Sequence, residues 1–213
     1  MNSRLDPASH VSSLPLAGST GDVAELARIF QPDCHLMCLR RQVPPDLAGF
    51  LHAAFASGAL RSGRRAVIDA GAALPPDMLP DLPGRDAVHE DVSRLSGLLA
   101  DLTGCPRAGV RIEVLDRAMC PRWHVDQVGL RLLTTWIGPA TEWLAEHCAD
   151  RRLLGSDAVM ADASGIGRAG TGDVVLMKGE RWPGNAGRGV IHRSPALSTP
   201  HRVRIVAAID AVW

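Results

Sequence analysis

Apolar residues recur along this chain with two different spacings, and the spacing changes near residue 105. Before that point they lie three or four residues apart, most regularly over 86–103, which is the pattern of one buried helix face. The same spacing predicts helices over 22–30 and 44–57. Beyond residue 105, apolar residues alternate with polar ones or form short runs, as strands do, over 110–115, 128–136, 173–177 and 202–212. A helical first part packed on a strand-rich second part is therefore predicted.

Two strands are also expected inside the first part, over 34–39 and 65–69, and the proline-rich stretch 74–84 is expected to be irregular. Residues 1–20 are rich in Ser, Pro and Gly and show no periodicity, which is typical of a mobile tail. We therefore predict one integrated α+β domain made of three segments: a tail over 1–20, a mainly helical portion over 21–105, and a β-rich core over 106–213.

Charge and composition narrow the class of protein. The 23 Lys and Arg residues balance 23 Asp and Glu residues, so no excess positive charge favours a nucleic acid or a membrane surface as partner. No apolar run approaches the roughly 18 residues of a membrane helix, and the first residues do not resemble a secretory signal. Five scattered cysteines are typical of reduced thiols in the cytoplasm. We expect a cytoplasmic globular protein, whose exposed strand edges are compatible with an oligomer.

The segment around His124 carries the strongest candidate chemistry. His124 and Asp126 are two residues apart, and in a strand such residues point to the same side, where an imidazole and a carboxylate can bind one metal ion. With a second histidine they make the facial triad of non-haem Fe(II) sites. A second pair with this spacing, His89 and Asp91, falls in the clearest helix, where residues two apart point about 200° away from each other. Only the pair at 124 and 126 is therefore a metal candidate.

His192 is the candidate for the third ligand. It follows a Gly-led apolar segment, and Arg202 comes ten residues later, where an arginine can cross a hairpin and hold a carboxylate with its planar guanidinium group. Arg204 has the same strand parity, so either arginine can face the site. Structural roles are the alternatives: Asp126 in a salt bridge with Arg131, His192 capping a hairpin, and both arginines on the surface.

The order of these elements resembles the 2-oxoglutarate- and Fe(II)-dependent oxygenase superfamily. The resemblance rests on the segments RWHVDQVGLRLLTTWIG, GDVVLMKG, VIHRSP and HRVRIVAAID. It implies a double-stranded β-helix, also called a jelly roll and similar to cupins, as the fold of the metal-binding core 106–213. It also implies that His124, Asp126 and His192 are iron ligands and catalytic residues, and that Arg202 binds the cosubstrate carboxylate.

Two features depart from the oxygenase pattern. Arg204 stands where many of these oxygenases have a serine, which leaves Arg202 and Arg204 as rival carboxylate partners. The chain contains no tyrosine to donate a phenolic hydrogen bond, so Thr134, Thr135 or Arg131 would take that place in cosubstrate binding.

More narrowly, residues 25–213 resemble a bacterial family known as domain of unknown function 1826. That resemblance implies an association with metals, zinc in particular. The interpretation is therefore an Fe(II)- and 2-oxoglutarate-dependent oxygenase that hydroxylates an unidentified small-molecule or peptide substrate. The alternatives are a cupin-like zinc protein for metal handling or hydrolysis, and an inactive jelly-roll interaction module. Metal and 2-oxoglutarate binding distinguish the three.

Overall fold

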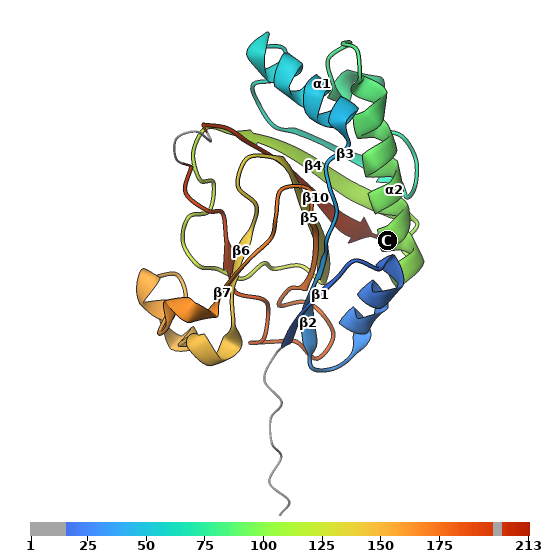
Figure 1. Cartoon of the computed structure of the whole chain (residues 1–213). Coiled ribbons are helices and arrows are strands. Elements are labelled where there is room, and N and C mark those ends of the chain that lie inside the picture. The colour runs from blue at the N-terminus through green and yellow to red at the C-terminus, as the bar shows by residue number, and fades with distance from the viewer. Residues whose placement is uncertain (1–15, 198–201) are drawn as a thin grey trace, which may run out of the picture.

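The computed structural model describes residues 16–197 and 202–213, and Figure 1 shows two β-sheets with helices packed beside the larger one. The larger sheet has seven strands and the smaller has three. The strands are β1 Leu16–Thr20, β2 Cys34–Leu39, β3 Arg64–Asp69, β4 Arg107–Leu115, β5 Leu130–Ile137, β6 Glu142–Leu144, β7 Ile166–Arg168, β8 Val174–Lys178, β9 His192–Arg193 and β10 Arg204–Val212. The helices are α1 Pro45–Ala56 and α2 Arg85–Thr103, with 3-10 helices at Val23–Phe30, Pro76–Met78, Glu146–Cys148, Arg151–Leu153, Asp157–Val159 and Ala163–Gly165.

The larger sheet has the strand order β1-β2-β8-β5-β10-β4-β3. All of its neighbouring strands are antiparallel except β1 and β2, which are parallel. The long strand β10 lies between β4 and β5, and it alternates between two apolar layers. Ile205, Ala207 and Ile209 face the helices, whereas Val206 and Ala208 face the interior between the two sheets. A residue's parity on β10 therefore decides which of the two layers its side chain enters.

The smaller sheet has the order β7-β6-β9, and an antiparallel bridge between His124 and His192 adds the segment around His124 beside β9. Its inner face packs on the larger sheet, because Val190 and Trp143 share one apolar cluster with Leu36 and Met177. Strands β2, β5 and β8 therefore face β6 and the segment that leads into β9. Strands β4, β5 and β10 line one cavity with His124 and β9. The molecule is a mixed α+β protein whose sheet-rich core has the arrangement of a jelly roll.

Helix α2 forms where the apolar spacing predicts it and covers the outer face of the larger sheet. Its apolar side, with Val88, Val92, Leu95 and Leu99, is fully buried in the main core. It ends at Gly104, whose positive φ of 74° is readily adopted by glycine and closes the last turn. The strands predicted at 34–39 and 65–69 are confirmed as β2 and β3.

Three predictions about the first part differ from the structure. Residues 1–15 of the predicted tail lie outside the described residues, but Leu16–Thr20 form strand β1. Backbone hydrogen bonds to β2 hold this strand, and the side-chain pattern of the sequence does not predict them. The helix expected over 22–30 is a 3-10 helix, although Asp22 caps it as predicted. The larger sheet also extends beyond the predicted core 106–213, because β1, β2 and β3, which precede residue 106, form both of its edges. None of the helices in the described part of the chain is long and apolar enough to span a membrane.

Candidate metal centre

Three predicted ligands meet at the inner face of the smaller sheet. One ligand atom from each of His124, Asp126 and His192 lies within 4.8 Å of the other two. Nε2 of His192 is 3.2 Å from Oδ2 of Asp126, and Nε2 of His124 is 3.8 Å from Oδ1 of the same carboxylate. The backbone bridge between the two histidines fixes this arrangement, because each donates its N–H to the carbonyl of the other.

Both imidazole rings are oriented with Nε2 toward the centre. Nδ1 of His124 is 3.0 Å from the carbonyl oxygen of Arg122, and Nδ1 of His192 is 3.0 Å from that of Val190. A carbonyl oxygen can only accept, so Nδ1 carries a proton in each ring, and Nε2, which points toward Asp126, is the nitrogen that could bind a metal. Burial, together with the neighbouring His192, holds the pKa of His124 below its ordinary value. Neutral imidazoles held by carbonyl groups are the form in which histidine binds a metal.

Asp126 is kept ionised by its neighbours. Burial acts to raise its pKa, but hydrogen bonding to His192 and the charge of Arg131 outweigh it and hold the pKa of Asp126 well below its ordinary value. Arg131 donates to Asp126 at 2.8 Å and binds both carboxylate oxygens of Asp210, at 2.7 and 2.6 Å. The salt bridge weighed as an alternative role for Asp126 is therefore present, and it coexists with the cluster of three ligands. Arg131, predicted to bind cosubstrate, lines the cavity of the three ligands and is paired with the carboxylates of Asp126 and Asp210.

Arg204 enters the same interior from the start of β10. Its side chain is buried, and it donates to three hydroxyl groups: Ser194 Oγ at 2.7 Å, Thr141 Oγ1 at 3.0 Å and Thr135 Oγ1 at 3.3 Å. Among the described residues no carboxylate lies within ion-pair distance of Arg204, and its buried Nε has no partner. Burial lowers the pKa of Arg204 to about 10. The site therefore contains a buried cation without a counter-ion.

The other two predicted cosubstrate residues lie elsewhere. Arg202 is exposed and precedes the first residue of β10, so it does not line the cavity that contains the three ligands. Thr134 points to the opposite face of β5, where its hydroxyl binds Arg41 and the carbonyl of Gly172. The alternation of a strand explains this correction, since Thr135, one residue later, faces the interior.

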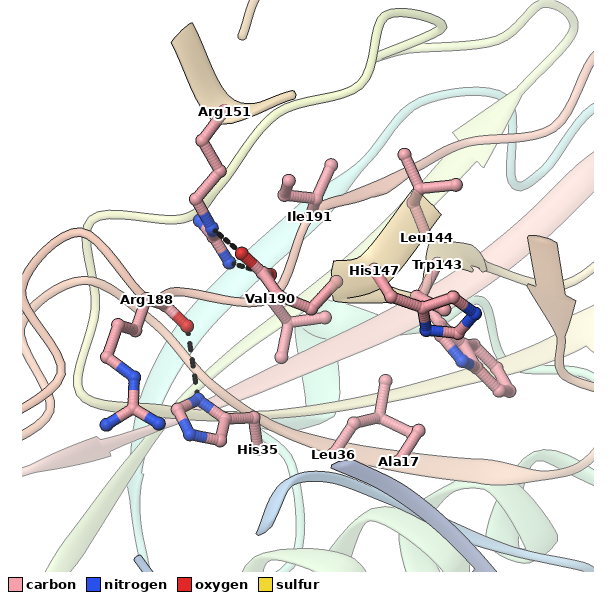
Figure 2. Close-up of a pocket in the computed structure, with 12 residues that line it drawn as sticks. Ala17, His35, Leu36, Trp143, Leu144, His147, Arg151, Arg188, Val190 and Ile191 are labelled. Atoms are coloured by element: carbon pink, nitrogen blue, oxygen red, sulfur yellow. Dashed lines mark hydrogen bonds and ion pairs between the residues drawn. The ribbon is translucent and has the colours of Figure 1, made fainter. Parts of the chain in front are cut away.

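Sequence reasoning missed Thr141 and Ser194. Ser194 lies two residues after His192, so strand parity is a signal that could have placed it on the same side. Thr141 comes from the turn before β6 and carries no comparable signal. The cavity that these residues share with the three ligands has a volume of about 150 Å³. A second cavity of about 250 Å³, shown in Figure 2, contains none of the predicted site residues.

Solved structures with the same arrangement of sheets are oxygenases. The rice dioxygenase for auxin oxidation superposes with a TM-score of 0.55 at 17% sequence identity, over 93% of this chain and 83% of that one. The dioxygenase for auxin oxidation 1 from Arabidopsis thaliana, solved in complex with 2-oxoglutarate, gives a TM-score of 0.53 at 10% identity, over 93% of this chain and 92% of that one. At such identities the similarity establishes the fold, and it confirms the predicted resemblance to the architecture of 2-oxoglutarate- and Fe(II)-dependent oxygenases.

No curated protein matches this sequence. A protein family does: residues 20–210 match the family described as protein of unknown function (DUF1826), and the match covers all described strands except the first residues of β1 and the last residues of β10. The chain therefore belongs to the DUF1826 family.

Proposed function

We propose that this protein is an Fe(II)- and 2-oxoglutarate-dependent oxygenase that hydroxylates a C–H bond of its substrate. One observation carries the proposal: the cluster of His124, Asp126 and His192 lines the same cavity as Arg204, a buried cation without a counter-ion. The fold of the auxin-oxidising dioxygenases supports it. The Arabidopsis structure contains 2-oxoglutarate, an anion whose carboxylates could pair with the buried Arg204 of this chain.

The donor set fits the metal. Two neutral imidazoles and one carboxylate are the facial triad that holds Fe(II) and leaves coordination positions open. His124, Asp126 and His192 would be those ligands. Bound Fe(II) with 2-oxoglutarate supplies the activation of dioxygen, with oxidative decarboxylation of the cosubstrate to succinate and carbon dioxide.

The protein's own groups prepare this site before any ligand arrives. The carbonyl groups of Arg122 and Val190 fix the tautomers of the two histidines, and Arg131 holds Asp126 in its ionised form. Arg204 and its three hydroxyl partners would bind the distal carboxylate of 2-oxoglutarate. The hydroxyl groups can rotate to donate to a carboxylate while they accept from Arg204.

The test is an anaerobic titration of metal-free protein with Fe(II) and then with 2-oxoglutarate. We expect a visible charge-transfer band that requires both additions and is lost in His124→Ala. His89→Ala is the matched control, because His89 and Asp91 have the same spacing but lie on helix α2. That variant should keep the band.

Other outcomes of the titration contradict the proposal in distinguishable ways. Tight zinc binding without any effect of 2-oxoglutarate would make the protein a zinc protein, since the same ligands also suit zinc. Binding of neither metal would leave a jelly-roll interaction module.

A further inference from the structure

Three charged side chains in a row connect the larger sheet to the metal centre. Asp210 on β10 and Arg131 on β5 are directly opposite each other in the sheet, so their side chains leave it on the same face. Arg131 lines the cavity of the three ligands and reaches from the sheet to Asp126. The order of charges is therefore Asp210, Arg131 and Asp126, and only the last of these is a predicted metal ligand.

Asp210 occupies one whole edge of the guanidinium group of Arg131. Nε of Arg131 donates to Oδ1 of Asp210 at 2.7 Å, and Nη2 donates to Oδ2 at 2.6 Å. Only Nη1 reaches the metal centre, where it donates to Oδ2 of Asp126 at 2.8 Å. A planar group that is held by two hydrogen bonds on one edge cannot turn without losing both. Asp210 therefore fixes the direction from which Arg131 approaches Asp126.

The two carboxylate oxygens of Asp126 are used unequally as a result. Oδ2 accepts the hydrogen bond from Arg131 and lies 3.2 Å from Nε2 of His192. Oδ1 lies 3.8 Å from Nε2 of His124, and no donor among the described residues forms a hydrogen bond to it. Carboxylates that bind a metal are themselves held by hydrogen bonds from neighbouring groups. This arrangement leaves Oδ1 as the oxygen that is available to a metal.

An arginine this close to a metal ligand opposes metal binding unless it is held. A guanidinium group can bind both oxygens of a carboxylate, and its positive charge repels a divalent cation. Asp210 prevents the first by occupying Nε and Nη2 of Arg131, and its negative charge offsets the second. Arg111 also approaches Asp210, but at 3.7 Å the two groups are too far apart for a hydrogen bond. Arg131 is therefore the main partner of Asp210.

A purely structural role for this ion pair is the alternative. Strands β5 and β10 are already joined by backbone pairing from Ile205 to Asp210, so the side-chain pair stands at the end of an established register. A cross-strand pair of opposite charges contributes only about 0.2–1 kcal/mol to a sheet. The pair is thus not needed to hold the strands together, whereas its inner end contacts a metal ligand.

We propose that Asp210 is a positioning residue of the metal centre: it holds Arg131 on one oxygen of Asp126 and so leaves the other oxygen for the metal. Asp210 itself does not belong to the cluster of three ligands. The inference rests on one part of the proposed function, namely that His124, Asp126 and His192 bind a divalent metal. It does not depend on 2-oxoglutarate.

The test is a titration of the metal-free, full-length protein with Co(II), whose visible absorption changes when protein ligands replace water. Asp210→Asn keeps the size of the side chain and removes its charge. We expect this variant to bind Co(II) about 10- to 100-fold more weakly, the usual effect of losing a residue that supports a metal ligand. Asp69→Asn is the matched control, because Asp69 is an exposed carboxylate on β3 outside the cavity. It should bind Co(II) as the wild type does.

The double variant Arg131→Met/Asp210→Asn separates positioning from a structural role. Without Arg131 no guanidinium group competes for Asp126, so the double variant should recover about tenfold in Co(II) affinity over Asp210→Asn. A structural role predicts no recovery, because the double variant lacks both members of the ion pair. Thermal unfolding shows whether each variant is folded, and Asp210→Ser replaces Asp210→Asn if the latter is not.

The outcomes separate this proposal from the proposed function. The positioning role is overturned if Asp210→Asn binds Co(II) as tightly as the wild type, or if the double variant binds no more tightly than Asp210→Asn. If the variants behave as expected but 2-oxoglutarate has no effect on the bound metal, the oxygenase proposal fails and the positioning role stands. A wild-type protein that does not bind Co(II) would contradict both.

Discussion

Two arginines in this protein illustrate opposite ways of burying a positive charge. Arg41 donates to both carboxylate oxygens of Asp91, and Asp91, 1% exposed, also accepts from Arg94 and from Nε1 of Trp136. Arg204 donates only to hydroxyl groups and keeps a buried Nε without a partner. The charge of Arg41 is neutralised by Asp91, whereas the charge of Arg204 has no counter-ion among the described residues.

The difference separates a structural ion pair from a ligand-binding site. We call the outer face with Asp91 and Arg41 the closed side, and the inner face with Arg204 the open side. Asp91 lies on α2 and Trp136 on β5, so their hydrogen bond and the pairing with Arg41 fix the helix on the outer face of the larger sheet. No ligand is needed there, because the carboxylate is already fully occupied. On the inner face, Arg204 lies beside a cavity with the three metal ligands. A buried cation in that position costs free energy unless an anion joins it.

The largest expected effect is on the closed side. Asp91→Ala removes the carboxylate and leaves Arg41 and the indole N–H of Trp136 without their partner. Breaking a buried ion pair on one side costs about 3–5 kcal/mol, so the free energy of unfolding should fall by roughly that amount in urea denaturation. Asp101→Ala is the control, because Asp101 is an exposed carboxylate on the same helix and its loss should change stability by less than about 0.5 kcal/mol. Equal effects of the two substitutions would contradict the assignment of Asp91 as a structural anchor.

A smaller effect, of a different kind, is expected on the open side. Arg204→Gln should weaken 2-oxoglutarate binding about 10- to 100-fold, since a charge-assisted hydrogen bond contributes about 1.5–3 kcal/mol. Its effect on the free energy of unfolding should be less than about 1 kcal/mol, because removing an uncompensated buried cation offsets the lost hydrogen bonds. Isothermal titration with Fe(II)-loaded protein measures the first quantity and urea denaturation the second.

Arg202→Gln is the matched control for that experiment. The sequence left Arg202 and Arg204 as rivals, and the structure places Arg202 on the surface. Its substitution should leave 2-oxoglutarate affinity unchanged. If Arg202→Gln were the variant that lost affinity, the role proposed for Arg204 would be wrong.

The same contrast explains what the sequence could and could not predict. Helix α2 and strands β4, β5, β8 and β10 follow from their apolar spacing, because burial on one face imposes a period on each element. His124 and Asp126 follow from strand parity. Parity could not separate Arg202 from Arg204, because both have the same parity and the separation depends on where β10 begins. Thr134 was assigned to the wrong face because an apolar run such as 130–137 does not show which side faces the interior.

Contacts between segments far apart in the chain could not be predicted from the sequence, for a different reason. Asp91 was considered only as a member of a His-x-Asp pair, and its partner Arg41 is 50 residues away. β1 joins the sheet through backbone hydrogen bonds, which depend weakly on side-chain identity. Such features arise from the packed arrangement of elements and not from local spacing.

The smallest predicted effect is the pH dependence that Asp91 adds to stability. Burial alone would raise its pKa, but hydrogen bonds from Arg41, Arg94 and Trp136 outweigh burial and hold the pKa of Asp91 below its ordinary value. The unfolded chain therefore binds a proton at this residue at a higher pH than the folded protein does. Its contribution to stability is complete above about pH 4, the ordinary pKa of aspartate, and is lost as the pH falls toward the lower folded value.

Asp91→Asn lacks this proton-binding group, so the stability gap between wild type and variant should narrow as the pH falls below 4. One proton changes the free energy of unfolding by at most about 1.4 kcal/mol per pH unit, so between pH 4 and pH 3 the gap should close by roughly 1 kcal/mol. Urea denaturation at half-unit steps from pH 5 to pH 3 measures it, and using the difference between the two proteins cancels the other carboxylates that titrate in the same range. Parallel stability curves would mean that the carboxylate of Asp91 is not held ionised by Arg41, and that the closed side of the molecule is balanced in some other way.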